Sequence, residues 1–104
     1  MRSPADIKRE IEARLKKYLS RDNTGIRHEV LSLFVRVRST TIPEIHAQVS
    51  RTFSVSYHSI ASMVGIIAAR IGILHVRREQ EGTNAVYQIK DEYIGMVTHL
   101  LKCG

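Results

Sequence analysis

The order of residue patterns between Thr24 and Ile89 constrains the fold of this chain most. Three patterns with apolar residues at helical spacing follow one another, and two short patterns of alternating apolar and polar residues come after them. A polar loop that contains Gly82 joins the two alternating patterns, so they predict a β-hairpin. At 104 residues the chain is long enough for one hydrophobic core and too short for two. We therefore expect a single α+β domain over residues 1–104, mostly helical.

Residues 24–37 form the first predicted helix of this section. The sequence Thr41-Ile42-Pro43-Glu44 reads as a capping box with proline in the first turn, and it opens a second helix that ends near Arg51. The third predicted helix covers residues 56–71, with Ser56 as its N-cap and Gly72 as its C-terminal cap. Its inward side has apolar residues at steps of four, three and four: Ile60, Val64, Ile67 and Ile71.

The hairpin strands are predicted at about 74–78 and 85–89. Two further helices flank the section that runs from residue 24 to residue 89. One covers 4–20 and begins after an N-cap at Ser3, and the other covers 91–102 with Asp91 as its cap. Each flanking helix has an apolar stripe, which is expected either to form a dimer contact or to pack into the core of the same chain.

In this arrangement the section from residue 24 to residue 89 resembles the winged-helix superfamily, above all small prokaryotic and archaeal transcriptional regulators. The resemblance is carried by residues 27–34 (RHEVLSLF), 41–45 (TIPEI), 55–60 (VSYHSI), 71–74 (IGIL) and 87–89 (YQI). It implies a three-helix core with a β-hairpin wing, here with extra N-terminal and C-terminal helices. It also implies that the third helix lies in the DNA major groove and that the wing contacts the backbone.

The formal net charge of +6 and the pI near 9.9 favour a polyanionic partner. Residues 1–21 contain seven Lys or Arg against three Asp or Glu, a net charge of +4, whereas residues 53–89 contain three against two, a net charge of +1. The first helix therefore carries most of the basic excess. We interpret its basic residues as a solvated helix face, in which Glu12 pairs with Lys16 four residues later: Lys8, Arg9, Lys16, Lys17 and Arg21.

Outward-facing positions of the third predicted helix include His58, Ser62, Gly65 and Ala69, with Ser59 to one side. Serine and histidine near a helix N-terminus can contact phosphates or base edges, and arginines at the end of the second helix and on the wing can contact the backbone. The side lacks the Arg, Asn or Gln that bind bases in bidentate fashion, so strong direct base readout is not expected. The candidate DNA-binding residues are Arg51, Ser56, His58, Ser59, Ser62, Arg77 and Arg78.

Each candidate has a simpler interpretation. The outward side of the third helix is alternatively a solvent-exposed face or one covered by another subunit. Arg77 and Arg78 are alternatively surface partners of Glu79 and Glu81, which follow directly.

The sequence predicts a cytoplasmic, homodimeric DNA-binding protein that acts in transcriptional regulation on double-stranded DNA. The alternative is a winged-helix module that binds another protein within a larger assembly, which the nearly neutral segment 53–89 favours; RNA binding is a weaker third interpretation. Neither a catalytic motif nor metal-ligand spacing is seen among the isolated histidines or at the single Cys103, so we expect no enzyme activity, metal, cofactor or small-molecule ligand. We see no signal peptide or membrane-spanning run, and the lone cysteine fits a reducing compartment.

Overall fold

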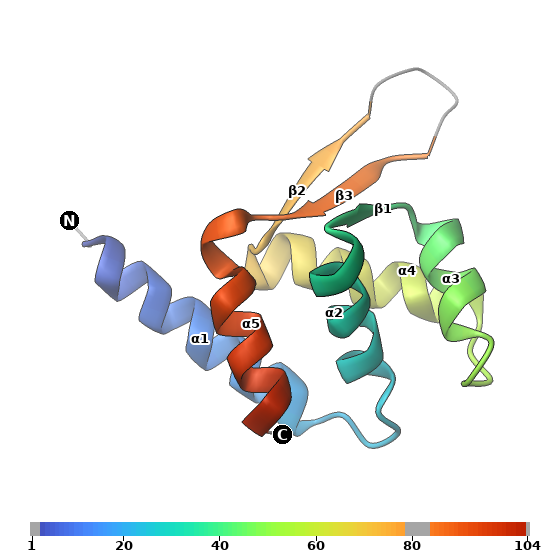
Figure 1. Ribbon diagram of the computed structural model, residues 1–104, viewed down its shortest axis with the longest axis horizontal. Coiled ribbons are helices and arrows are strands. Elements are labelled where there is room, and N and C mark those ends of the chain that lie inside the picture. Colours follow the sequence, from blue (N-terminus) through green and yellow to red (C-terminus); the bar gives the residue numbers. More distant parts are fainter. Residues whose placement is uncertain (1–2, 79–83, 104) are drawn as a thin grey trace.

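The computed structural model describes residues 3–78 and 84–103, which form an α+β fold that is mostly helical (Figure 1). In chain order its elements are α1 (Pro4–Ser20), α2 (Ile26–Val37), β1 (Ser39–Thr40), α3 (Ile42–Val49), α4 (Tyr57–Ile66), a π-helical turn η1 (Ile67–Ile71), β2 (Leu74–Arg77), β3 (Val86–Ile89) and α5 (Asp91–Cys103). The predicted helices and hairpin strands are all present, within two residues of their expected ends. The predicted loop residues 79–83, with Glu79, Glu81 and Gly82, lie outside the described residues.

Side-chain caps begin α1 and α4 as expected. The Ser3 hydroxyl accepts from the Asp6 amide at 3.2 Å, and the Asp6 carboxylate accepts from the Ser3 amide at 3.4 Å, which completes a capping box at α1. The Ser56 hydroxyl accepts from the Ser59 amide at 3.1 Å and starts α4.

The capping box predicted at Thr41 forms only in part. The Thr41 hydroxyl accepts from the Glu44 amide at 3.4 Å, as expected for an N-cap. The Glu44 carboxylate accepts instead from the hydroxyl of the buried Thr40, at 2.8 Å. Glu44 therefore satisfies a buried side chain and does not close the box.

The helix predicted over 56–71 ends in a wider turn than the spacing indicates. It is α-helical to Ile66, and the π-helical turn Ile67–Ile71 follows. The Gly72 amide donates to the Ile67 carbonyl at 3.0 Å, and Gly72 has φ of +84°. The stop at this glycine is confirmed, while the π turn has no signature in the apolar spacing.

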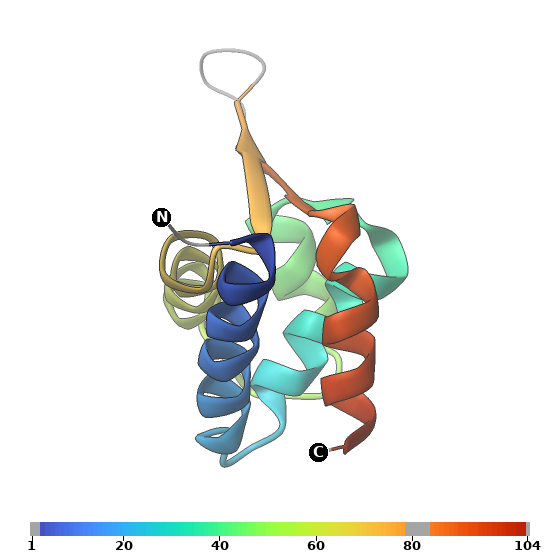
Figure 2. The ribbon, with the colours of Figure 1, turned by 90° about the vertical axis from the view of Figure 1, so that its left-hand side faces the viewer.

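A three-stranded antiparallel sheet has the order β1-β3-β2. Strand β1 is absent from the sequence-based prediction, since two residues are too few to show an alternating pattern. It follows Arg38, whose φ of +70° turns the chain out of α2 and whose carbonyl accepts from the Ile89 amide at 2.9 Å. The β2–β3 hairpin extends beyond the helices (Figure 2).

Every helix contributes to one buried core. The inward residues of α4 and η1 are buried as predicted: Ile60, Val64, Ile67 and Ile71. The apolar stripe of α1 from Ile11 onwards and that of α5 are also buried within the same chain, where the two helices contact each other. In α5 the buried residues are Tyr93, Val97 and Leu100, while Ile94 and Leu101 are half-buried and pack against the core.

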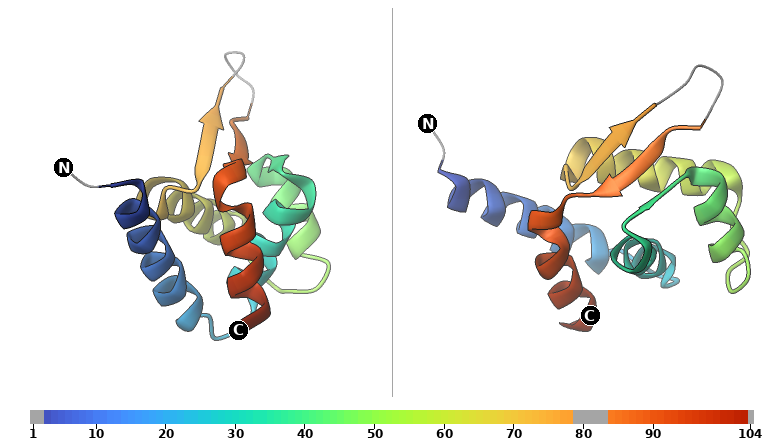
Figure 3. Two further views of the ribbon diagram at one scale, coloured as in Figure 1. Left: turned by 60° about the vertical axis from the view of Figure 1, so that its left-hand side comes forward. Right: turned by 45° about the horizontal axis from the view of Figure 1, so that its top comes forward.

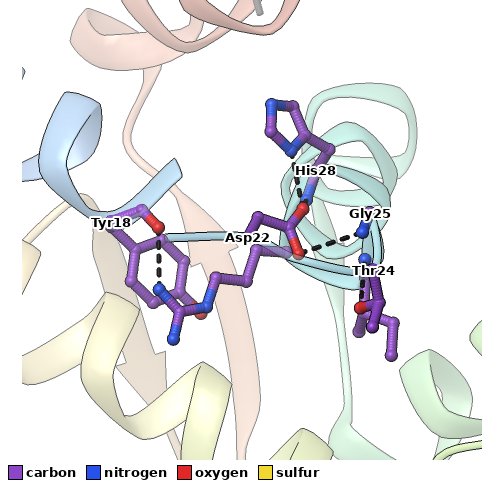
Figure 4. Close-up of polar contacts among 7 residues, drawn as sticks. Tyr18, Asp22, Thr24, Gly25 and His28 are labelled. Atoms are coloured by element: carbon purple, nitrogen blue, oxygen red, sulfur yellow. Dashed lines mark hydrogen bonds and ion pairs between the residues drawn. The ribbon is translucent and has the colours of Figure 1, made fainter. Parts of the chain in front are cut away.

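A buried carboxylate organises the connection from α1 to α2 (Figure 4). The Asp22 side chain is 2% exposed and accepts from the amides of Gly25 and His28, each at 3.1 Å. His28 Nδ1 lies 2.7 Å from the same carboxylate and must donate, because an ionised carboxylate only accepts. Burial alone raises the pKa of Asp22, but the hydrogen bonds from His28, Arg27 and Gly25 together outweigh it and lower that pKa below its ordinary value of 3.8.

We predict that Asp22→Asn lowers the free energy of unfolding by about 1–3 kcal/mol at pH 7, because buried donors lose a charged acceptor. An acid with a lowered folded-state pKa contributes stability above its unfolded pKa and loses it as the pH falls through the folded value. The variant should therefore lose less stability than the parent between pH 5 and pH 2. Urea denaturation across this range measures both effects, with Glu92→Gln as the control at an exposed carboxylate. Equal acid sensitivity of Asp22→Asn and the parent would contradict the assignment.

The two glycines of the α4–η1 segment give a second prediction. Gly72→Ala should destabilise the protein by about 1–2 kcal/mol, because a Cβ is unfavourable at its left-handed φ of +84°. Gly65→Ala should stabilise it by about 0.5–1 kcal/mol, because Gly65 lies in regular helix and an added Cβ meets nothing within 4 Å. Thermal unfolding of both variants checks the opposite signs, and the same sign for both would contradict the placement of the helix end.

Candidate nucleic-acid interface

The buried side of α4 determines which of its residues face solvent. Because Ile60 and Val64 fix the rotation of the helix in the core, His58, Ser62 and Gly65 are exposed, as is Ala69 in η1. This confirms the outward positions predicted from the sequence.

The α4 N-terminus is held by local contacts. The Ser56 hydroxyl donates to the Ser59 hydroxyl at 3.0 Å, and Ser59 is half-buried. Tyr57 is 46% exposed, and its ring meets the His46 ring edge-on at 5.8 Å. His46 Nε2 lies 3.0 Å from the Val55 carbonyl, which ties α3 to the start of α4. Of the predicted site residues here, Ser56 and Ser59 are engaged with each other, while His58 and Ser62 have exposed side chains.

The predicted arginines lie on other elements. Arg51 is exposed in the turn between α3 and α4, two residues after α3 ends, and not in the helix as predicted. Arg77 ends β2 and Arg78 follows it, both exposed, beside Val76 at 53% exposure. In Figure 3 the hairpin that carries them extends away from the helices. The structure therefore gathers His58 and Ser62 on one side of α4 and leaves Arg77 and Arg78 on the hairpin.

A groove of about 420 Å³ lies where α1 passes η1 and the start of α2. Its apolar wall is Ile66 and Ile71. The other residues that line it are Arg14, Lys17, Tyr18, Arg21, Arg27 and Arg70. We call this the basic groove.

The basic groove changes the interpretation of the first helix. Lys16 pairs with Glu12 at 3.2 Å as predicted, and Arg9 lies 3.9 Å from Asp6, so these residues belong to a solvated face. Lys17 and Arg21 are exposed as well, and in addition they line the groove.

The basic residues singled out from the sequence did not include three of the groove arginines: Arg14, Arg27 and Arg70. Arg14, Lys17 and Arg21 recur at steps of three and four, which places them on one side of α1, and this spacing was a usable signal. Arg27 and Arg70 come from other elements, and only the fold brings them to this side.

Hydrogen bonds to carbonyl groups hold two of the arginines in place. Arg27 donates to the Tyr18 carbonyl at 2.7 Å, and its guanidinium lies 4.4 Å from the centre of the Tyr18 ring (Figure 4 labels Tyr18). Arg14 donates to the Arg70 carbonyl at 3.2 Å. A carbonyl is uncharged, so these bonds orient the guanidinium groups without neutralising them. Within residues 3–78 and 84–103, none of the five basic residues of the groove forms an ion pair.

The Tyr18 hydroxyl lacks a hydrogen-bond partner among the described residues, although Tyr18 is only 8% exposed. Burial raises the pKa of Tyr18, the Arg27 charge lowers it and the Asp22 charge raises it, with a net upward shift. The hydroxyl is therefore protonated at neutral pH and available as a donor.

Neither a metal site nor a membrane-spanning helix is seen in the described part of the chain. Residues 3–78 and 84–103 contain no group of three or more His, Cys, Asp or Glu side chains placed to hold a metal ion. Nor do they include a helix long and apolar enough to cross a membrane.

Comparison with known proteins gives a family without an assigned activity. Residues 15–97 match the family described as "Protein of unknown function (DUF2551)". A protein of Archaeoglobus fulgidus described as "Uncharacterized protein" is 38% identical over 94 residues, which cover 89% of this chain and 94% of that protein. No solved structure matches the chain. The matched region runs from α1 to α5, and the chain belongs to the DUF2551 family.

Proposed function

We propose that this protein is a winged-helix DNA-binding protein that acts in transcriptional regulation in the cytoplasm. In this proposal α4 enters the major groove of double-stranded DNA, and the β2–β3 hairpin contacts the backbone as a wing. The observation that carries the proposal is the exposed side of α4, which runs from His58 to Gly65 and on to Ala69 in η1. Residues 56–71 contain no acidic residue, so nothing on this segment repels a phosphate backbone.

The size of the exposed side chains supports close approach to DNA. Small residues at Ser62, Gly65 and Ala69 would let the helix backbone lie deep in a groove about 12 Å wide. His58 and Ser62 would reach base edges or phosphates, while Ser59, half-buried and bonded to Ser56, would serve to fix the helix start. Shape and backbone contacts would therefore dominate over direct base readout.

The basic residues around this side would supply the electrostatic part. Arg51 in the turn before α4 and Arg77 and Arg78 on the hairpin are exposed. From these places they would contact phosphates on either side of the groove that holds α4.

A two-fold dimer that reads two half-sites remains part of the proposal. Its interface has to lie outside the apolar stripes of α1 and α5, since both stripes are buried within one chain. The exposed apolar residues Ile7 on α1 and Val37 at the end of α2 are the available alternatives.

A protein-binding module is the second candidate function. Tyr57 at 46% exposure and Val76 at 53% exposure favour it, because large exposed apolar side chains often mark protein interfaces. In that case the same surface would bind a protein partner and ignore DNA.

Charge placed on the exposed side of α4 tests the proposal. Ser62→Glu should weaken binding to a mixed-sequence DNA duplex by at least about tenfold, because it adds a carboxylate where phosphates would lie. Fluorescence anisotropy at 50 mM salt measures the affinity. Ala5→Glu is the matched control, since it adds the same charge at an exposed position of α1. No binding of the parent at low salt, or equal loss in both variants, would contradict the DNA-binding proposal.

The hairpin arginines give a prediction about salt dependence. Arg77→Ala/Arg78→Ala should reduce the slope of log affinity against log salt by about 2, because each phosphate that an arginine neutralises adds about 0.9 to that slope. Lys8→Ala/Arg9→Ala removes two exposed charges from the first turns of α1 and should leave the slope nearly unchanged. An unchanged slope in the hairpin variant would remove the wing from the proposed interface.

A further inference from the structure

The basic groove concentrates positive charge that the described parts of the fold do not neutralise. Arg14 and Lys17 come from α1, Arg21 is the C-cap of α1, Arg27 comes from α2 and Arg70 from η1. The Asp22 carboxylate on the connecting segment accepts from the amides of Gly25 and His28 and from the His28 ring. Its charge acts on Tyr18, but it forms no ion pair with these five cations. Cations without a paired carboxylate repel one another, so the gathering of five in one groove is unfavourable without an anion.

The geometry of the arginines suits an anion with several oxygens. The bonds of Arg14 and Arg27 to carbonyl groups use one nitrogen of each guanidinium, and the remaining N–H groups can bind a ligand. A guanidinium orientated in advance loses less entropy when it binds.

The Tyr18 hydroxyl is a second observation at a residue that lines the groove. Its oxygen is closed to solvent, so a ligand would reach it only after a local shift of the side chains around it. The hydroxyl is a buried donor without a partner among the described residues. Leaving such a group unpaired is costly, and an anion oxygen would satisfy it.

We propose that the basic groove binds a phosphate group, carried either by the DNA backbone or by a small phosphorylated molecule. A phosphate has enough oxygens to accept from several arginines and from the Tyr18 hydroxyl together. The groove volume of about 420 Å³ is within the range of small-molecule sites, and Ile66 and Ile71 offer an apolar wall to the rest of a ligand. This inference stands on the groove and does not depend on α4 entering DNA.

Occupation of the groove would connect α1 to the end of the α4–η1 segment. Arg14 already contacts the Arg70 carbonyl across this gap. A phosphate bound by residues of both elements would fix α1 against η1 and raise the melting temperature.

Three variants test the proposal with pyrophosphate as the small probe and a mixed-sequence duplex as the nucleic-acid probe. Lys17→Ala/Arg21→Ala removes two groove cations that anchor no backbone group in the described structure. Tyr18→Phe removes only the hydroxyl and should keep or raise the melting temperature, because the parent hydroxyl is buried and unpaired. Lys8→Ala/Lys16→Ala removes the same charge from the exposed part of α1 and is the control.

Isothermal titration calorimetry with pyrophosphate should show affinity that falls about tenfold in Lys17→Ala/Arg21→Ala and at least about threefold in Tyr18→Phe. The control should change it less than about twofold. This pattern supports a small phosphorylated ligand. If pyrophosphate binds weakly and the two groove variants lose the same affinity for the duplex, the result supports a phosphate of the DNA backbone.

The inference is overturned if, with both probes, the groove variants lose no more affinity than the control variant. The result is separable from the proposed function. Pyrophosphate bound in the groove of a protein that ignores the duplex would leave the inference and remove the DNA proposal. If duplex binding depends on Ser62 and not on the groove, and pyrophosphate does not bind, the DNA proposal stands and the groove inference is removed.

Discussion

Burial of one side of the α4–η1 segment sets the geometry on which the other features depend. Ile60, Val64 and Ile67 are fully buried there, and each is worth about 1.5–3 kcal/mol relative to an exposed side chain. Because a helix cannot rotate once this side is packed, the opposite side is fixed towards solvent. The same packing brings Arg70 to α1 and delivers the chain through Gly72 into the hairpin.

The chain separates its charged surface from its α4 surface. The exposed side of α4 has hydroxyl, imidazole and small side chains, whereas cations gather in the basic groove beside η1. A phosphate-binding role for the groove and a DNA-reading role for α4 would then use adjacent surfaces of one molecule. The nearly neutral charge of segment 53–89 is compatible with this division, because residues 1–21 carry +4 of the net charge of +6.

Local signals in the sequence predicted the helices well. Apolar spacing together with caps such as Ser3 and Ser56 was enough, because helix boundaries depend on neighbouring residues. Strand β1 and the π turn η1 escaped prediction, since both arise from hydrogen bonds that the apolar spacing does not encode. The candidate site was less accessible to prediction. Exposure of His58 and Ser62 followed from the helical period, but the contribution of Arg27 and Arg70 depends on how α1 packs against η1 and the start of α2. Such contacts between distant segments have no local signature.

The central claim is that the exposed side of α4 lies against nucleic acid. The most direct measurement is a titration of ¹⁵N-labelled protein with a mixed-sequence duplex, followed by amide chemical shifts. We expect the largest shifts at His58, Ser62 and Gly65 and along β2, with little change along α5. Shifts confined to other surfaces, or none at low salt, would contradict the account.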